Sequence, residues 1–230
     1  MAKRPVFFSN GRERLVKEEL VDFRWNPGFA PIQKKKNVSA LHEAAEKKGF
    51  SPLLEISTKS EETLGQRLSA FNLKIATDIG EISLEAAYQG SKVFASGGPY
   101  TDIYRKDGRG AKKDIRVRTS GELVCFKFFE DEWPLEPKTA FYDWLYITAL
   151  EPYQEFLRRL FDYKGFTDIE FNPGKSINCQ ARACALLVSL LKFGLLNEAL
   201  LSQRDFIDIT SSDSVEKNHP TESQQRNLPL

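Results

Sequence analysis

Three side chains with complementary chemistry recur at helical spacing: Glu85, Gln89 and Lys92. A helix over residues 83–94 would place them within roughly 60° of one another, on one face. The rise along that helix separates Glu85 from Lys92 by about 10 Å, so the pair would flank a ligand about as long as a sugar phosphate. From spacing alone, an exposed face with a Glu–Gln pair is the commoner arrangement, and this alternative stays open.

Histidine and cysteine are scarce in this chain. There are two histidines, His42 and His219, and three cysteines, Cys125, Cys179 and Cys184. The cysteines form no CxxC pair and their number is odd, which argues against a disulfide framework. Two distant histidines leave little material for a zinc site or a Ser-His-Asp triad. We therefore expect no metal and no cofactor, and assign any catalysis to carboxylates, amides, lysines or tyrosines.

Two segments after residue 94 suit a ligand that carries a base and phosphates. Residues 97–102 form a glycine-rich loop whose Tyr100 could close over a planar base, although an ordinary connector fits as well. Residues 105–118 hold seven positive and two negative side chains, a net +5 in a chain of net +1. Glycines before a helix start present amides and cations to phosphate, while a merely solvated surface is the open alternative. The lysine run at residues 34–36 fits a solvated edge.

A third segment, residues 167–181, predicts a strand, a tight turn and a capped helix. Asp168 and Glu170 fall at the strand end beside the helix start, where sites are common. The Asn-Pro-Gly sequence at residues 172–174 is also an ordinary turn, and the purely structural interpretation is slightly favoured.

Apolar periodicity predicts a predominantly helical α+β fold. The expected helices cover residues 39–48, 83–94, 110–119, 137–150, 153–163 and a long last one from about 177, with Gly194 as a weak point. The expected strands cover residues 6–8, 53–57, 123–129 and 167–171.

Composition sets the organisation of the chain and its compartment. A mixed N-terminal extension, residues 1–67, is expected to pack on a core of residues 68–206. Residues 207–230 are polar, so we expect a disordered tail. The N-terminus does not fit a signal peptide, and the apolar run at residues 183–191 is too short to span a bilayer. These features indicate a cytoplasmic protein without a membrane partner.

Several motifs occur in an order that resembles the NADAR (YbiA-like) superfamily. They are Leu-Ser-Ala-Phe-Asn at residues 68–72, the Glu85–Gln89–Lys92 motif, Ala-Lys at 111–112 with Arg116, and Trp133. This likeness covers about residues 68–200 and implies a single YbiA/NADAR-like domain.

A closer likeness extends over most of the chain, to about Phe206. The sequences of residues 98–102, 132–138 and 166–173 resemble those of the NADAR antitoxins associated with DarT-type toxins. This resemblance implies a hydrolase that removes ADP-ribose from a nucleobase, most plainly guanine in DNA, and so reverses the modification made by a DarT-type ADP-ribosyltransferase. The implied ligands are ADP-ribosylated nucleic acid or ADP-ribose, and the implied protein partner is a cognate toxin.

The resemblance also implies roles for individual residues. Glu85 would stabilise an oxocarbenium-like centre or activate water. Lys92 would attack a ring-opened ribose or hold the leaving group, and Gln89 would orient ribose hydroxyls. Lys112 and Arg116 would hold the diphosphate. Further ligand contacts are implied for Ser69, Phe71, Asn72, Tyr100, Trp133, Asp168 and Glu170.

Two other functions stay open at this point. One is a small-molecule N-glycosidase that acts on a phosphoribosyl intermediate, which salt dependence would distinguish from an enzyme that acts on DNA. The other is an antitoxin without enzymatic activity that binds its toxin through the N-terminal extension around Trp25 and Phe29.

Overall fold

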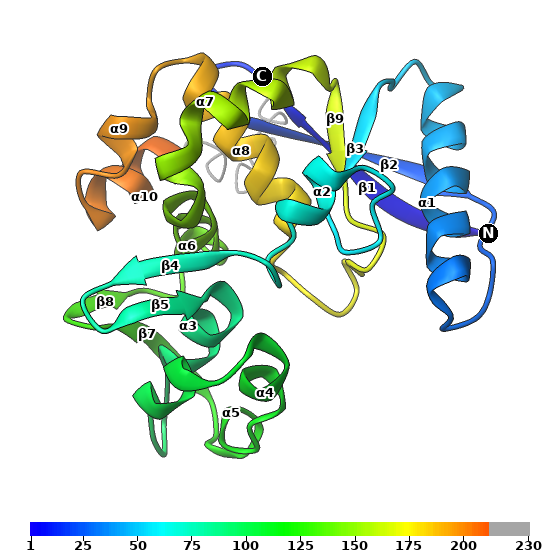
Figure 1. The fold of residues 1–230 in the computed structure, drawn as a ribbon. Coiled ribbons are helices and arrows are strands. Elements are labelled where there is room, and N and C mark those ends of the chain that lie inside the picture. The colour runs from blue at the N-terminus through cyan, green and yellow to red at the C-terminus, as the bar shows by residue number, and fades with distance from the viewer. Residues whose placement is uncertain (212–230) are drawn as a thin grey trace, which may run out of the picture.

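The structure, a computed structural model, describes residues 1–211 and has an α+β fold. Within those residues helix outweighs strand, as the sequence predicts. The strands form small sheets of four, two and three strands, with helices packed between them (Figure 1).

The four-stranded sheet joins the N-terminal strands to a strand more than 100 residues later in the chain. Its order is β2 (Val16–Phe23), β1 (Ala2–Ser9), β9 (Gly165–Thr167) and β3 (Leu53–Glu55). β1 runs antiparallel to β2 and to β9, whereas β3 and β9 are parallel. Residues far apart in sequence therefore lie side by side in one sheet.

β1 is buried on both faces, which explains its continuous apolar run. Val6 and Phe8 pack with Leu41 of α1 (Pro31–Glu46), while Phe7 joins the main core together with α8 (Gln180–Lys192). In Figure 1, α1 lies on one side of this sheet and α8 on the other. The N-terminal segment thus contributes to the main core as well as to its own small cluster.

The middle of the chain builds a second lobe around a short helix. β4 (Lys74–Thr77) and β5 (Gly80–Ser83) form a hairpin that leads directly into α3 (Leu84–Gly90), which packs on α6 (Ala140–Leu150). The three-stranded sheet has the order β6 (Lys92–Phe94), β7 (Leu123–Phe128) and β8 (Asp131–Trp133). Between β6 and β7 the chain forms η1 (Thr101–Arg105), α4 (Gly108–Lys113) and α5 (Arg116–Thr119).

Short helices complete the described fold. They are α2 (Thr63–Arg67), η2 (Glu151–Tyr153), α7 (Gln154–Leu157), η3 (Arg158–Asp162), α9 (Leu196–Ala199) and α10 (Gln203–Ser211). Across residues 1–211, no helix is long and apolar enough to cross a bilayer.

The predicted helix over residues 83–94 is wrong in its second half. α3 ends at Gly90, and Lys92 lies in β6, which pairs with β7. A Cβ atom on Gly90 would come within 2.6 Å of the Tyr104 ring, so only glycine allows this close packing. Beyond it, Val93 and Phe94 are residue types that favour strands.

Other predicted boundaries shift for similar local reasons. The helix expected over 110–119 is divided into α4 and α5 at Asp114, which accepts hydrogen bonds from Arg116. The strand expected over 167–171 is instead β9, which ends at Thr167. α10 continues to Ser211, past the residue 207 at which the tail was expected to begin. The rest of that predicted tail, residues 212–230, lies outside the described residues.

Candidate functional site

The first turn of α3 places Glu85 at the bottom of a cleft. Ser83 caps this helix by accepting a hydrogen bond from the backbone N–H of Ala86. Glu85 is only 8% exposed, and a Cβ atom on Gly108 of α4 would lie 3.1 Å from the Glu85 Cβ. The close approach of α4 therefore buries the Glu85 side chain.

Glu85, Gln89 and Lys92 form one hydrogen-bonded chain. Lys92 Nζ donates to Gln89 Oε1 at 2.8 Å, and Gln89 Nε2 donates to Glu85 Oε1 at 2.8 Å. Gln89 is itself 7% exposed. The Glu–Gln pair is thus buried rather than on a solvated face, and Gln89 links the carboxylate to the amine.

Burial of Lys92 makes its neutral form more accessible than that of an exposed lysine. Burial lowers the pKa of Lys92 to about 8, opposed by the charge of Glu85 and assisted by that of Lys112. Its Nζ also lies 4.8 Å from the centroid of the Tyr88 ring, an apolar cover on one side. An amine with this pKa is neutral in about a tenth of molecules at pH 7, enough for nucleophilic chemistry.

These three residues line a pocket of about 600 Å³, a size typical of small-ligand sites. Of the residues predicted from the sequence, it brings together Phe71, Glu85, Gln89, Lys92, Lys112, Asp168 and Glu170. The remaining walls come from Ala70, Tyr88, Tyr142, Phe171, Pro173, Gly174, Lys175, Ser176, Ile177, Asn178 and Gln180.

The wall opposite α3 carries a second carboxyl group, Asp168, just after β9. Burial and the neighbouring Glu55 raise the pKa of Asp168 to about 8, against hydrogen bonds from the backbone of Glu170 and from Gln180. Tyr142 also lines this region, and burial together with the charge of Glu85 raises its pKa well above the usual range. The pocket thus contains a carboxylate on α3 and a protonated acid across from it.

The loop between β9 and α8 closes one side of the pocket. Asn178 Nδ2 donates to the Tyr88 hydroxyl at 2.7 Å, which ties the loop to α3. At the start of α8, Gln180 Oε1 accepts the backbone N–H of Ala70 at 2.7 Å. Lys175 lies in this loop and Lys112 faces it from α4, so two cations line the pocket in addition to Lys92.

Five predicted ligand residues lie elsewhere. They are Ser69, Asn72, Tyr100, Arg116 and Trp133, none of which lines this pocket. Ser69 is fully buried below it, with its hydroxyl 3.5 Å from Gln180 Oε1, and Asn72 donates to the backbone of Gln66. Trp133 is 1% exposed and packs against Phe141, Trp144 and Phe206 in the core.

Arg116 is already engaged by protein groups. Its guanidinium donates to both oxygens of Asp102 and both oxygens of Asp114, and it lies 4.5 Å from the centroid of the Tyr100 ring. These bonds lower the pKa values of Asp102 and Asp114. Lys106 adds a further bond to Asp114 at 2.6 Å. Lys106 and Arg116 are therefore paired with carboxylates, and Lys112 is the residue of this segment that lines the pocket.

Sequence reasoning missed Tyr88, Tyr142, Asn178 and Gln180 as pocket residues. Tyr88 lies within α3 and lines the pocket beside Glu85 and Gln89. Asn178 and Gln180 fall inside the strand, turn and helix segment that was singled out for its carboxylates, so its polar helix start was a usable signal. Among residues 1–211, no group of three or more metal-ligating side chains is assembled.

The family model for the DarT1-associated NADAR antitoxin matches residues 2–220 of the chain, nearly its full length. The chain belongs to this family. The resemblance drawn from the motifs is thereby confirmed. A comparison with curated proteins finds no match. For this NADAR antitoxin, the family match covers the N-terminal sheet, α3 and the acid-bearing loop alike.

Proposed function

We propose that this NADAR antitoxin hydrolyses the N-glycosidic bond between ADP-ribose and a nucleobase, with guanine in DNA as the expected base. One observation carries the proposal: a buried Glu85–Gln89–Lys92 chain lines a pocket of about 600 Å³, opposite Asp168. Paired acids with different protonation and a desolvated amine are the groups that such a reaction requires.

In the first step the C1′–O4′ bond breaks, O4′ takes a proton, and C1′ is left double-bonded to the nitrogen of the base as a cationic imine. The Glu85 carboxylate stabilises that charge, and Gln89 holds the carboxylate while its own position allows contact with a ribose hydroxyl. Asp168, protonated, supplies the proton that O4′ takes as the ring opens, and it recovers a proton from Lys92 after the later hydrolysis. Acid and carboxylate thus act from opposite walls.

Lys92 completes the reaction as a nucleophile. Its neutral amine adds to C1′ of the ring-opened ribose, and the amine of the base takes a proton and leaves. Water then hydrolyses the imine between Lys92 and C1′, which releases ADP-ribose and restores the amine. In this proposal Lys112 and Lys175 hold the diphosphate, because both line the pocket and Arg116 does not.

The decisive experiment measures free ADP-ribose after the purified protein is incubated with oligonucleotides ADP-ribosylated on guanine or on thymine. We expect release from the guanine substrate, and a steep loss of rate with rising salt if DNA is the substrate. Release that is insensitive to salt would favour the small-molecule N-glycosidase. No release from either oligonucleotide would overturn the proposal.

Direct binding to the toxin is a second candidate, favoured by one observation. Phe29 and the nearby Ile32 are 98% and 62% exposed, next to the loop that contains Trp25. Exposed apolar side chains of this kind are typical of protein interfaces. Co-elution with the toxin, and rescue from toxicity by a Glu85→Ala protein, would support this function. Phe29→Ser should then abolish the rescue.

A further inference from the structure

Glu55 is a buried carboxylate that the proposed reaction does not use. It is the last residue of β3 and 2% exposed, and it lies opposite Thr167 in the parallel pairing of β3 with β9. A charge so far removed from water requires specific partners. The hydrogen-bond partners of Glu55 show which part of the structure it fixes.

Glu55 accepts three hydrogen bonds, and two of the donors belong to the chain neighbours of Asp168. Thr167 Oγ1 donates to Oε2 at 2.7 Å, and the backbone N–H of Ile169 donates to Oε1 at 2.8 Å. Ser57 Oγ donates to Oε1 at 2.7 Å. Thr167 and Ile169 are the chain neighbours of Asp168, so Glu55 fixes the backbone on both sides of the pocket acid.

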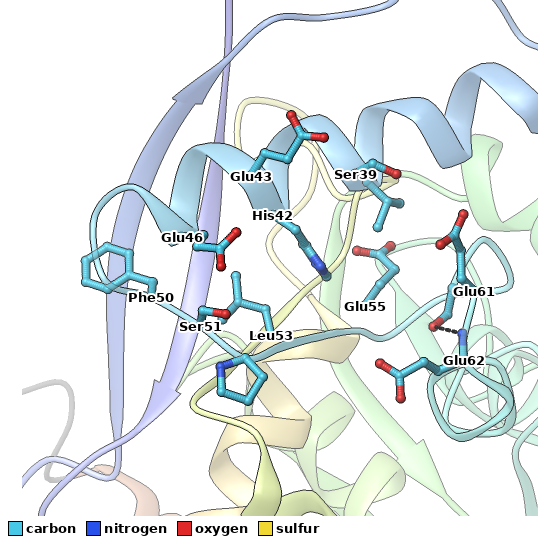
Figure 2. A pocket seen from close by; sticks show the side chains of 13 residues that line it. Ser39, His42, Glu43, Glu46, Phe50, Ser51, Leu53, Glu55, Glu61 and Glu62 are labelled. Carbon is cyan, nitrogen blue, oxygen red and sulfur yellow. Dashed lines mark hydrogen bonds between the residues drawn. The ribbon is translucent and has the colours of Figure 1, made fainter.

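His42 extends this network from α1. Its Nε2 lies 2.8 Å from Thr167 Oγ1, and because the Thr167 hydroxyl donates its proton to Glu55, His42 must donate here. Burial lowers the pKa of His42 to about 4, so its ring is neutral. Figure 2 shows His42 and Glu55 pointing toward one another at a second cavity, of about 390 Å³, whose lining shares no residue with the pocket that contains Asp168.

The hydrogen bonds determine which member of the Glu55–Asp168 pair carries the charge. Burial raises the pKa of Glu55, but hydrogen bonds from Ile169, Thr167 and Ser57 reach both of its oxygens and oppose that rise. In Asp168 the backbone N–H groups of Glu170 and Phe171 both donate to Oδ1. Two carboxyl groups this close do not both ionise readily, so the proton of the pair is left on Asp168.

The other titratable groups around Asp168 do not move the shared proton from Asp168 to Glu55. Tyr142 and Tyr146 of α6 and the thiol of Cys179 interact with Asp168, and burial raises the pKa of each, which keeps all three neutral. Glu170, in the same loop, adds a negative charge and lies 3.8 Å from Lys34. Arg4 of β1 faces Asp168 as a cation.

We propose that Glu55 is a positioning residue of the pocket: its ionised carboxylate fixes residues 167–169 and keeps Asp168 protonated, so that Asp168 presents an O–H donor to the ligand. The inference rests on the proposed function for the role of that donor. It assigns to the N-terminal sheet a direct part in preparing the pocket.

The test follows the Asp168 carboxyl carbon by NMR during a pH titration of the full chain, with the signal assigned by Asp168→Asn. In the wild type, Asp168 should remain protonated at pH 7. Glu55→Gln keeps the shape and removes the charge, so the titration midpoint of Asp168 should fall by about one pH unit or more.

Two control variants separate charge from structure. Ser57→Ala removes one hydrogen bond but leaves the Glu55 charge, and Glu61→Gln removes an exposed carboxylate from the same second cavity. Both should leave the midpoint within half a unit. An Asp168 already ionised at pH 7 in the wild type would overturn the proposal, even if Glu55→Gln failed to fold. An unchanged midpoint in folded Glu55→Gln would overturn it as well.

The same experiment does not depend on turnover. If the oligonucleotide assay shows no ADP-ribose release while the midpoint shifts as expected, the proposed function fails and the coupling of Glu55 to Asp168 stands. If ADP-ribose is released with no shift, the coupling fails alone.

Discussion

Glu85→Gln tests the catalytic chain, because the substitution has two effects of opposite sign. It removes the carboxylate that accepts from Gln89, and it removes a charge that raises the pKa of Lys92. Loss of a charge stabiliser or general base costs a factor of about 100 to 10,000 in rate. The lowered pKa of Lys92 works the other way, since it increases the neutral amine.

The second effect has an upper limit. With a pKa of about 8, Lys92 is neutral in about a tenth of molecules at pH 7, so complete deprotonation gains about tenfold at most. The carboxylate loss therefore dominates, and the rate should fall by at least about tenfold at pH 7. The deficit should shrink slightly toward low pH, where the gain in neutral amine is relatively larger.

The assay is single-turnover release of ADP-ribose from the guanine-modified oligonucleotide at pH 6, 7 and 8. Glu81→Gln is the matched control, because its side chain is 65% exposed and pairs only with Lys74 in the structure's salt bridges. This control should retain wild-type activity, and both proteins should share the wild-type melting temperature. A Glu85→Gln rate within threefold of wild type would remove Glu85 from the mechanism.

Three further predictions address the other parts of the pocket and the core. Borohydride added during turnover should trap ADP-ribose on Lys92 as a reduced imine, detectable by mass spectrometry; turnover without an adduct reduces Lys92 to a binding role. Lys112→Ala should weaken ADP-ribose binding by about 10- to 100-fold in isothermal titration, whereas Arg116→Ala, held by aspartates, should change it less than twofold. An equal loss of ADP-ribose affinity in the two variants would contradict the assignment of the diphosphate to Lys112. Trp133→Ala should lower the free energy of unfolding by about 3–5 kcal/mol in urea denaturation, and a smaller loss would show that this core position is not tightly packed.

The sequence predicted the grouping of side chains better than the elements that carry them. Spacing at four and seven residues indicated that Glu85, Gln89 and Lys92 belong together, and they are hydrogen-bonded. The predicted helix was too long, because the packing of Gly90 against Tyr104 is a tertiary contact. Local spacing therefore grouped side chains that line one pocket, while non-local packing decided their geometry.

Charge was harder to interpret from the sequence than spacing. Counting cations in residues 105–118 correctly indicated a basic segment, but not that Asp102 and Asp114 would occupy Arg116. Likewise, nothing local to residue 55 shows that its side chain reaches residues 112 and 114 positions later in the chain. Such pairings depend on the register of β3 against β9, which no single segment specifies.

The position of β9 between β1 and β3 has a consequence for biosynthesis. As the chain leaves the ribosome, β1 and β3 appear early, but the strand that joins them is residues 165–167. Until then the N-terminal strands expose unpaired edges, and contacts that span more than 100 residues form slowly. The acid wall of the pocket is therefore among the last parts to assemble. A nascent antitoxin would begin to act only once most of its length has been synthesised. Its activity would therefore appear later than that of a protein of equal length whose site forms from contacts close in sequence.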